Sequence, residues 1–298
     1  IRQNIRLRSW ILSKITLIIC TKDRPQDLRN LLGSILNQTR MPDRMIVIDG
    51  SDDPIAHVLK EFPALNCEYQ LVRPPSLPKQ RNIGIKMLGV EDSWVGFLDD
   101  DLVLVVDALE ELERFVEREA GLAGKELVGV GLAINNEGLM AFHWWRFFLL
   151  LDKRPGGVFT PSGCPAAIRS VHHDLDVEWL YGGATFWKSI VYREFGFDEW
   201  FDGTGYYEDV DFSYRVSRKY RLALSPKSRC FHYHHPVRKE KLFPLGVWQI
   251  TGWWYFVSKT KDFSSLFVLW SMLGLAANNV VLGLLSPSTG RLKRGLGN

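Results

Sequence analysis

The stretch SWVGFLDDD, residues 93–101, is a continuous apolar run that ends in three aspartates. A run of this kind is typical of a strand that is buried on both faces of a parallel sheet. ITLIIC (15–20) is a similar apolar run, and RMIVID (44–49) and CEYQLV (67–72) repeat the strand signal. Each of these segments is followed by polar residues. Because ligands of open α/β sheets bind beyond the carboxyl ends of the strands, we expect the chemistry at these polar endings.

Segments with helical periodicity lie between these strands. After the first strand, apolar residues recur at a spacing that puts them on one helical stripe: Leu28, Leu31, Leu32, Ile35 and Leu36. ALEELERFVEREA (108–120) predicts a charged helix, and LVGVGLAI (127–134) predicts another strand. The alternation predicts an α/β fold, with an open, mostly parallel sheet flanked by helices.

Composition narrows the possible classes of function. The chain has 298 residues, of which 46% are hydrophobic, enough for a large globular core. Its formal net charge of +3 is too balanced for a protein that binds nucleic acid by phosphate neutralisation, so we expect no nucleic-acid partner. The cysteines lie far apart without a CxxC pair, which predicts neither a zinc site nor a disulfide framework: Cys20, Cys67, Cys164 and Cys230.

The acidic run FLDDD (97–101) is a candidate metal site. Three adjacent carboxylates repel one another unless a cation lies among them. Hard divalent cations such as Mg²⁺ take carboxylate oxygens and keep positions for substrate phosphates, so the run suits a nucleoside diphosphate ligand. A solvated acidic turn that caps the next helix is the alternative.

Other polar endings have both a binding and a local interpretation. VIDGSDD (47–53) offers Asp49, which can accept a hydrogen bond from a base or a ribose, but its residues also suit an Asx turn. The residues of CTKDRP (20–25) suit a cap of the following helix as well as they suit a binding role. The basic residues of LPKQRNIG (77–84) can neutralise a diphosphate, although exposed basic side chains are often simply solvated.

Two motifs in the second half supply further candidates. GYYEDVDF (205–212) opens a helix with acidic residues, whose alternative role is to complement the helix dipole. RCFHYHHP (229–236) places His232 and His234 on one face of a presumed strand, because side chains two residues apart point the same way. A hydrogen-bonded structural histidine is the alternative there.

Taken in order, these motifs resemble those of the family 2 glycosyltransferases with a GT-A fold. The resemblance covers roughly Ile15 to Pro236 and rests on seven segments: CTKDRP, VIDGSDD, LPKQRNIG, FLDDD, WLYGGATFWKS, FGFDEWF and GYYEDVDFSYRV. It implies a GT-A domain at residues 15–240, in which residues 15–133 bind a nucleotide sugar and residues 134–240 present the acceptor.

For the donor, the resemblance implies a nucleotide sugar, with a UDP-sugar favoured. The implied donor-binding residues are Thr21, Asp23, Asp49, Arg81, Asn82, Asp99 and Asp100. Among them, Asp49 corresponds to the residue that contacts the nucleobase. The family more often has two aspartates before the glycine of this motif, where the chain has Ile48 and then Asp49, so the base and the sugar stay open.

The resemblance also implies a divalent metal, Mn²⁺ or Mg²⁺, that bridges the protein and the diphosphate. The FLDDD run supplies the DxD motif, and Asp101 is its implied metal ligand. His232 matches the position of a metal-ligating histidine in many relatives, with His234 as the alternative.

Inverting sugar transfer needs a carboxylate that removes the proton from the acceptor hydroxyl as it attacks the anomeric carbon. Asp209, in the family's ED motif with Glu208, is the candidate base. Gly182, Gly183 and Trp179 resemble the acceptor side of the site. The predicted function is metal-dependent, inverting glycosyl transfer in polysaccharide, glycan or glycolipid synthesis, with the acceptor and the linkage open.

Two alternatives have their own sequence requirements. A sugar-nucleotide pyrophosphorylase-like enzyme needs a glycine-rich phosphate loop after the first strand, and CTKDRP contains no glycine. The intact DDD and ED sets argue against a catalytically inactive carbohydrate-binding or membrane scaffold protein.

The two ends of the chain differ from the domain between them. Residues 1–14 are basic and amphipathic but lack the apolar run of a secretory signal. Residues 241–298 are hydrophobic, and Leu266–Leu285 is an uncharged run about 20 residues long, near the length of a spanning helix. We expect this segment to associate with a membrane, at the cytoplasmic face, with a carbohydrate or lipid-linked acceptor. Whether it spans the membrane, lies on it or packs on the domain is open, as is the oligomeric state.

Overall fold

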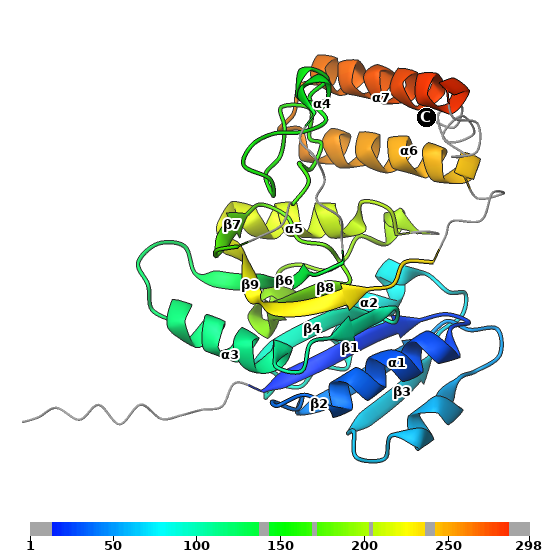
Figure 1. Cartoon of the computed structure of the whole chain (residues 1–298), viewed down its shortest axis with the longest axis vertical. Helices are drawn as coiled ribbons and strands as arrows, with labels where there is room; N and C mark the ends of the chain where they lie inside the picture. The colour runs from blue at the N-terminus through cyan, green and yellow to red at the C-terminus, as the bar shows by residue number, and fades with distance from the viewer. Residues whose placement is uncertain (1–13, 137–142, 169–171, 203–204, 236–241, 286–298) are drawn as a thin grey trace, which may run out of the picture.

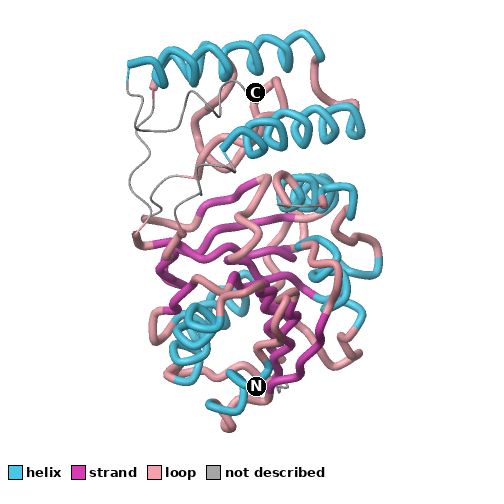
Figure 2. The backbone as a smooth tube through the Cα atoms, turned by 90° about the vertical axis from the view of Figure 1, so that its right-hand side faces the viewer, coloured by secondary structure: helices cyan, strands magenta, loops and turns pink. Residues whose placement is uncertain are grey.

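The structure, a computed structural model, describes five ranges of the chain: 14–136, 143–168, 172–202, 205–235 and 242–285. The expected amphipathic N-terminal segment lies outside the described residues except for Lys14, and the chain after Leu285 also lies outside them. Figures 1 and 2 show a central sheet, helices on its faces and two long helices stacked at one end of the molecule.

The first half of the chain forms the parallel part of the sheet. Its strands are β1 (Ile15–Thr21), β2 (Arg44–Asp49), β3 (Cys67–Leu71) and β4 (Trp94–Asp99). They run parallel in the order β3-β2-β1-β4, and the central strands of this group are almost wholly buried. Because the strands are parallel, their carboxyl ends lie at one edge, where the sequence predicted the chemistry.

The second half continues the same sheet with mixed strand directions. It contributes β5 (Leu102–Leu104), β6 (Leu127–Ile134), β7 (Leu175–Val177), β8 (Ala184–Lys188) and β9 (Arg221–His232). β8 pairs antiparallel with β4 and β6, whereas β6 and β9 are parallel. β5 and β7 pair antiparallel with β9. The expected α/β fold with a mostly parallel central sheet is confirmed, and antiparallel strands complete its second half.

Helices cover both faces of the sheet. They are α1 (Pro25–Leu36), α2 (Leu77–Lys86), α3 (Ala108–Glu119), α4 (Trp144–Phe148), α5 (Glu208–Lys219), α6 (Leu242–Thr260) and α7 (Ser265–Leu285), with short 3₁₀ turns η1 (Ala56–Glu61), η2 (Ser189–Arg193) and η3 (Glu199–Phe201). Leu17 and Ile19 of β1 share one hydrophobic cluster with α1 and α3, whereas Ile18 belongs to a second cluster with α5. The predicted stripe on α1 is buried except for Leu36, which is 41% exposed.

α6 packs into the same core as α5. Its Trp253 and Phe256 are buried in the cluster that contains Phe212 of α5. Trp253 Nε1 donates to the Ser162 carbonyl oxygen at 2.9 Å. Burial of each of these aromatic side chains contributes roughly 2 to 3 kcal/mol to the stability of the folded state. The start of the expected C-terminal segment therefore packs on the α/β domain.

α7 stacks on α6 as the outermost layer of the molecule (Figure 1). The sequence predicted a helix over Leu266–Leu285, and α7 confirms it. Its inner side buries Val268, Met272 and Leu275. Over the ranges that the structure describes, we find no helix with both the length and the apolar character needed to cross a membrane.

Candidate active site

The polar endings of β1 and β4 meet at one end of the parallel sheet. β4 ends at Asp99, and Asp100 and Asp101 form the turn that leads into β5. The Thr21 hydroxyl, at the end of β1, donates to Asp100 Oδ2 at 2.7 Å. Arg24 Nη1 lies 3.0 Å from Asp100 Oδ1 and 3.4 Å from Asp101 Oδ2. The last two aspartates of the run therefore share one positive charge.

The pKa values of Asp100 and Asp101 shift in opposite directions. Burial raises the pKa of Asp100 to about 6, although the Thr21 hydrogen bond and the Arg24 charge oppose this change. Burial also acts to raise the pKa of Asp101, but the hydrogen bond and the charge of His232 outweigh it and lower the pKa below its ordinary value. Asp101 is therefore held as the carboxylate, which is the form that binds a cation.

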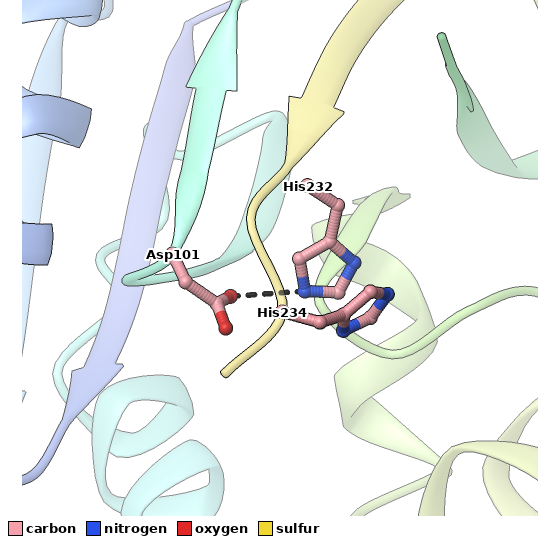
Figure 3. A group of neighbouring side chains, drawn as sticks. All are labelled: Asp101, His232 and His234. Carbon is pink, nitrogen blue, oxygen red and sulfur yellow. Dashed lines mark hydrogen bonds and ion pairs between the residues drawn. The ribbon is translucent and has the colours of Figure 1, made fainter. Parts of the chain in front are cut away.

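Asp101, His232 and His234 form a group with the spacing of metal ligands (Figure 3). His232 Nε2 lies 2.9 Å from Asp101 Oδ1, and the two imidazole ring centroids are 3.6 Å apart. One potential ligand atom from each of the three residues lies within 4.8 Å of the others. The set of one carboxylate and two imidazoles fits a divalent cation. The structure thus brings together the residue predicted as metal ligand and both candidate histidines.

Arg81 connects Asp99 with the ED pair at the start of α5. Its side chain is buried, with Nη1 paired to Glu208 Oε1 and Nη2 3.4 Å from Asp99 Oδ1. The guanidinium carbon lies 5.6 Å from the Phe97 ring centroid and 5.2 Å from that of Phe197, within the range of cation–π contact. Arg81, which the sequence placed near the donor, is an internal counter-ion for the acidic site.

Two backbone amides hold the Asp209 carboxylate. Oδ2 accepts a hydrogen bond from the Gly182 N–H at 2.9 Å, and Oδ1 accepts one from the Val210 N–H at 2.8 Å. Unlike Glu208, Asp209 keeps part of its surface exposed. Burial raises the pKa of Asp209, while the Arg81 charge and the two amides act against it. The arrangement provides an oriented carboxylate with an affinity for protons above that of a free aspartate.

Glu208 is buried, and only one of its two carboxyl oxygens has a partner in the described part of the chain. Oε1 is paired with Arg81, whereas Oε2 has no hydrogen-bond partner among the residues that the structure describes. Burial raises the pKa of Glu208 to about 8; Arg81 opposes this rise, and the Asp209 charge adds to it. One guanidinium faces three carboxyl groups, so its charge cannot compensate all of them. Burial therefore favours the protonated form of Glu208, whereas the Arg81 charge favours its carboxylate.

Two glycines before β8 make this close packing possible. A Cβ atom on Gly182 would lie 2.6 Å from Arg81 Nη1 and 2.8 Å from Asp209 Cβ. A Cβ atom on Gly183 would lie 2.0 Å from Asp99 Cγ. The sequence interpretation reserved this space for the acceptor. In the structure the side chains of the acidic site fill it instead.

A hydrogen bond joins the loop after β1 to the loop after β2. Asp49 is fully buried, and its carboxylate accepts hydrogen bonds from the Ser51 N–H at 2.7 Å, the Ile55 N–H at 2.9 Å and the Tyr69 hydroxyl at 2.6 Å. The Asp23 N–H donates to Ser51 Oγ at 2.7 Å. The Asx turn that was the alternative interpretation of VIDGSDD is therefore present, and Asp49 fixes the shape of the loop that follows β2.

Asn82 and Trp179 have structural partners. Asn82 Oδ1 accepts from the Phe197 N–H at 2.9 Å, and its Nδ2 donates to the Phe197 carbonyl oxygen at 2.8 Å. Trp179 is 5% exposed, and its indole N–H donates to the Ala166 carbonyl oxygen at 3.1 Å. The structure therefore places Trp179 in the core, the alternative to stacking on a sugar, and its acceptor-side role stays a prediction.

Arg24 is a site residue that the sequence did not single out. It lies within CTKDRP, where the helix-capping interpretation drew attention to the backbone and away from this side chain. The available signal was a cation in the loop after β1, since parallel neighbours place that loop beside the aspartates that follow β4.

Comparison with known proteins establishes the family. The sequence model of glycosyl transferase family 2 matches residues 16–175, more than half of the chain. The chain therefore belongs to glycosyl transferase family 2, in agreement with the resemblance of its motifs.

The curated relatives are longer proteins. The O-antigen biosynthesis protein RfbC of Myxococcus xanthus is 27% identical over 251 residues, which are 78% of this chain and 18% of that protein. An uncharacterized glycosyltransferase of Haemophilus influenzae is 29% identical over 123 residues, which are 39% of this chain and 45% of that protein. The chain thus spans less than half the length of either relative.

Solved structures share the fold. TarS of S. aureus, residues 1–349 in complex with UDP, superposes with a TM-score of 0.53 at 13% identity and covers 95% of this chain and 89% of that one. The same protein in complex with UDP-GlcNAc gives a TM-score of 0.51 at 13% identity with the same coverage. At this identity the likeness shows the fold, and it confirms the expected GT-A-type architecture.

Proposed function

We propose that the chain transfers a sugar from a UDP-sugar to an acceptor hydroxyl, with inversion at the anomeric carbon and with a divalent metal ion. The observation that carries this proposal is a single acidic site with two ends. The metal-ligand group of Asp101 and its histidines lies at one end, and the Asp209 carboxylate lies at the other. Asp99 and Arg81 connect them. These ends match the two requirements of the reaction, which are to hold a diphosphate and to deprotonate a hydroxyl.

Asp101, His232 and His234 would hold the ion. Mn²⁺ suits a donor set with imidazole nitrogens better than Mg²⁺, which is bound mainly through oxygen atoms. When bound, the ion supplies positive charge against the negative charge that develops on the departing diphosphate. Arg24, at 3.4 Å from Asp101 Oδ2, adds a fixed positive charge from the protein at the same end of the site.

Asp209 is the proposed base. The acceptor oxygen forms a bond to the anomeric carbon, its proton passes to a carboxylate oxygen of Asp209, and the bond to the diphosphate breaks with its electron pair leaving on the diphosphate. Attack opposite the leaving group inverts the anomeric carbon. The Gly182 and Val210 amides keep the carboxylate oriented while it accepts the proton. The raised pKa of Asp209 makes it a stronger base than an ordinary aspartate.

The comparisons support the choice of substrates. TarS structures in complex with UDP and UDP-GlcNAc favour a uridine nucleotide as donor. The relative named for O-antigen biosynthesis favours a carbohydrate or lipid-linked acceptor in polysaccharide, glycan or glycolipid synthesis. Because nucleotide sugars are made in the cytoplasm, we propose that transfer takes place at the cytoplasmic face of a membrane. The family match favours transfer over a pyrophosphorylase-like reaction or a scaffold role.

Titration calorimetry tests the donor assignment. UDP, GDP, dTDP and CDP are each titrated with Mn²⁺, with Mg²⁺ and with a chelator. We expect UDP to bind about tenfold or more tightly with Mn²⁺ than with the chelator. A preference for another nucleotide would contradict the UDP assignment, and UDP binding that is equal with and without metal would contradict the metal site. Retention of anomeric configuration in the product, seen by NMR, would contradict the inverting mechanism.

A further inference from the structure

The outermost helix, α7, lacks the polar outer side of a helix that faces water. Its most outward stripe consists only of apolar residues, which recur every three or four positions: Leu266, Trp270, Leu273, Ala277, Val281 and Leu284. The polar Ser271 and Asn279 are instead buried on the inner side. A helix on a water-facing surface has polar residues outside and apolar ones inside.

α4 extends this apolar stripe with exposed aromatic side chains. Trp144, Phe147 and Phe148 are 76%, 55% and 62% exposed. The Phe148 and Trp270 rings meet edge to face with centroids 5.5 Å apart, and Trp270 Nε1 donates to the Phe148 carbonyl oxygen at 3.1 Å. Figure 1 shows α4 beside one end of α7. We call α4 and the outward stripe of α7 together the apolar face.

The size and composition of the apolar face set it apart from ordinary surface. At a rise of 1.5 Å per residue, the stripe from Leu266 to Leu284 is about 27 Å long. The sequence contains no Asp, Glu, Lys or Arg between residues 263 and 290. Soluble monomers seldom expose a contiguous apolar patch larger than a few hundred Å² unless something binds there. Trp and Phe at its edge are typical of a boundary between water and lipid.

The charged residues near α7 in the sequence favour one occupant of the apolar face. No acidic residue follows Asp262 in the sequence, whereas Arg291, Lys293 and Arg294 follow the helix. An uncharged stripe on α7 that basic residues follow in the sequence suits an anionic lipid surface, because burial of apolar area and attraction to headgroups add together. A second copy of the chain would bring the same positive charges toward each other, so it fits the charge pattern less well.

We propose that the apolar face is a docking surface on which the protein lies flat on an anionic bilayer, with the side chains of α4 and α7 inserted below the headgroups. This inference goes beyond sugar transfer. Lys259 Nζ lies 2.8 Å from Asp211 of α5 and 2.7 Å from Asp198, so α6 is tied to the helix that begins with the ED pair. Docking through α7 therefore fixes the distance of the catalytic domain from the membrane.

Vesicle co-sedimentation of the full chain tests the proposal. The vesicles consist of phosphatidylcholine alone or of phosphatidylcholine mixed with phosphatidylglycerol. Leu273→Glu and Leu266→Glu place a charge on the apolar face, at side chains that are 69% and 77% exposed. Leu122→Glu, at a side chain that is 59% exposed beyond α3, is the matched control. We expect the two α7 variants to lose about tenfold or more of the affinity for mixed vesicles, and the control to bind as wild type does.

Three outcomes would overturn the proposal. They are wild-type protein that sediments with neither kind of vesicle, α7 variants that bind as wild type does, and a wild-type dimer that Leu273→Glu converts to a monomer without any vesicle binding. Circular dichroism confirms that each variant is folded. UDP titration of the same variants separates the two proposals, because a failure of docking leaves nucleotide binding unchanged.

Discussion

Arg81 and Glu208 form a buried ion pair between residues that are 127 positions apart in the sequence, and each is 2% exposed. The pair joins α2, in the first half of the chain, to α5, in the second half. Asp99 lies 3.4 Å from the same guanidinium. Removal of one partner of a buried pair leaves an uncompensated charge, at a typical loss of about 3 to 5 kcal/mol of stability. One arginine therefore positions both the strand end that carries the acidic run and the helix that carries the proposed base.

Glu208→Gln is expected to change how stability depends on pH. Burial raises the Glu208 pKa from 4.5 to about 8, so the folded protein holds a proton that the unfolded chain releases between these values. The stability owed to this group is therefore complete at low pH and is lost as the pH rises toward 8. Gln keeps the shape of the protonated side chain but does not titrate.

Urea unfolding of both proteins at several pH values between about 5 and 8 measures this effect. Wild-type stability relative to the variant should fall by up to about 1.4 kcal/mol per pH unit as the pH rises. A difference that is the same at every pH would show that the Glu208 pKa is not raised.

Asp101→Asn is expected to abolish metal-dependent UDP binding. The substitution removes the anionic ligand of the metal-ligand group and leaves the two histidines, which hold a hard cation weakly without a carboxylate. Calorimetry with Mn²⁺ measures the loss, and Asp174→Asn, at an exposed aspartate paired with Arg118, is the control. Unchanged metal-dependent affinity in a folded Asp101→Asn protein would remove Asp101 from the site.

The parallel half of the fold and its acidic edge could be predicted because their signals are local. Each buried strand is an uninterrupted apolar run, and each run is followed at once by its polar ending. Thr21 and Asp100 are far apart in the sequence but follow neighbouring parallel strands, so one topological rule brings them to 2.7 Å. His232 reaches Asp101 by a different route, because it lies opposite Leu102 in the antiparallel pair of β5 and β9.

The remaining features depend on packing between distant elements. Arg81 at the start of a helix looks exposed in the sequence, and only α5 brings Glu208 to it. The sequence around Trp179 does not distinguish a ring that faces a sugar from a ring in the core. Only the fold shows that Trp179 is buried and donates to Ala166. The apolar runs of α6 and α7 resemble membrane segments, yet the inner side of α6 contacts α5 through Lys259.

Asp209→Asn is expected to preserve UDP binding and to lower turnover by about 10² or more, the scale for loss of a positioned general base. Asn has nearly the same shape and still accepts from the Gly182 amide through its carbonyl oxygen. It cannot take up the proton of the acceptor hydroxyl. Initial rates of UDP release at saturating donor, together with calorimetry, separate binding from turnover. Near wild-type turnover would exclude Asp209 as the base and turn attention to Glu208 or Asp211.

Gly183→Ala is expected to destabilise the protein and weaken sugar transfer, because the new Cβ atom would lie 2.0 Å from Asp99 Cγ. Asp99 must then move away from Arg81, at a loss of about 1 to 3 kcal/mol for overpacking. Gly33→Ala is the matched control: Gly33 lies within α1, and nothing comes within 4 Å of its Cβ position. Alanine is the better helix former there, so this variant should gain about 0.5 to 1 kcal/mol. Urea unfolding and rates of UDP release test both variants. Equal stability and equal activity of the two would mean that Asp99 does not need the space beside β8, and the close packing of Asp99 and Arg81 would then have no bearing on the site.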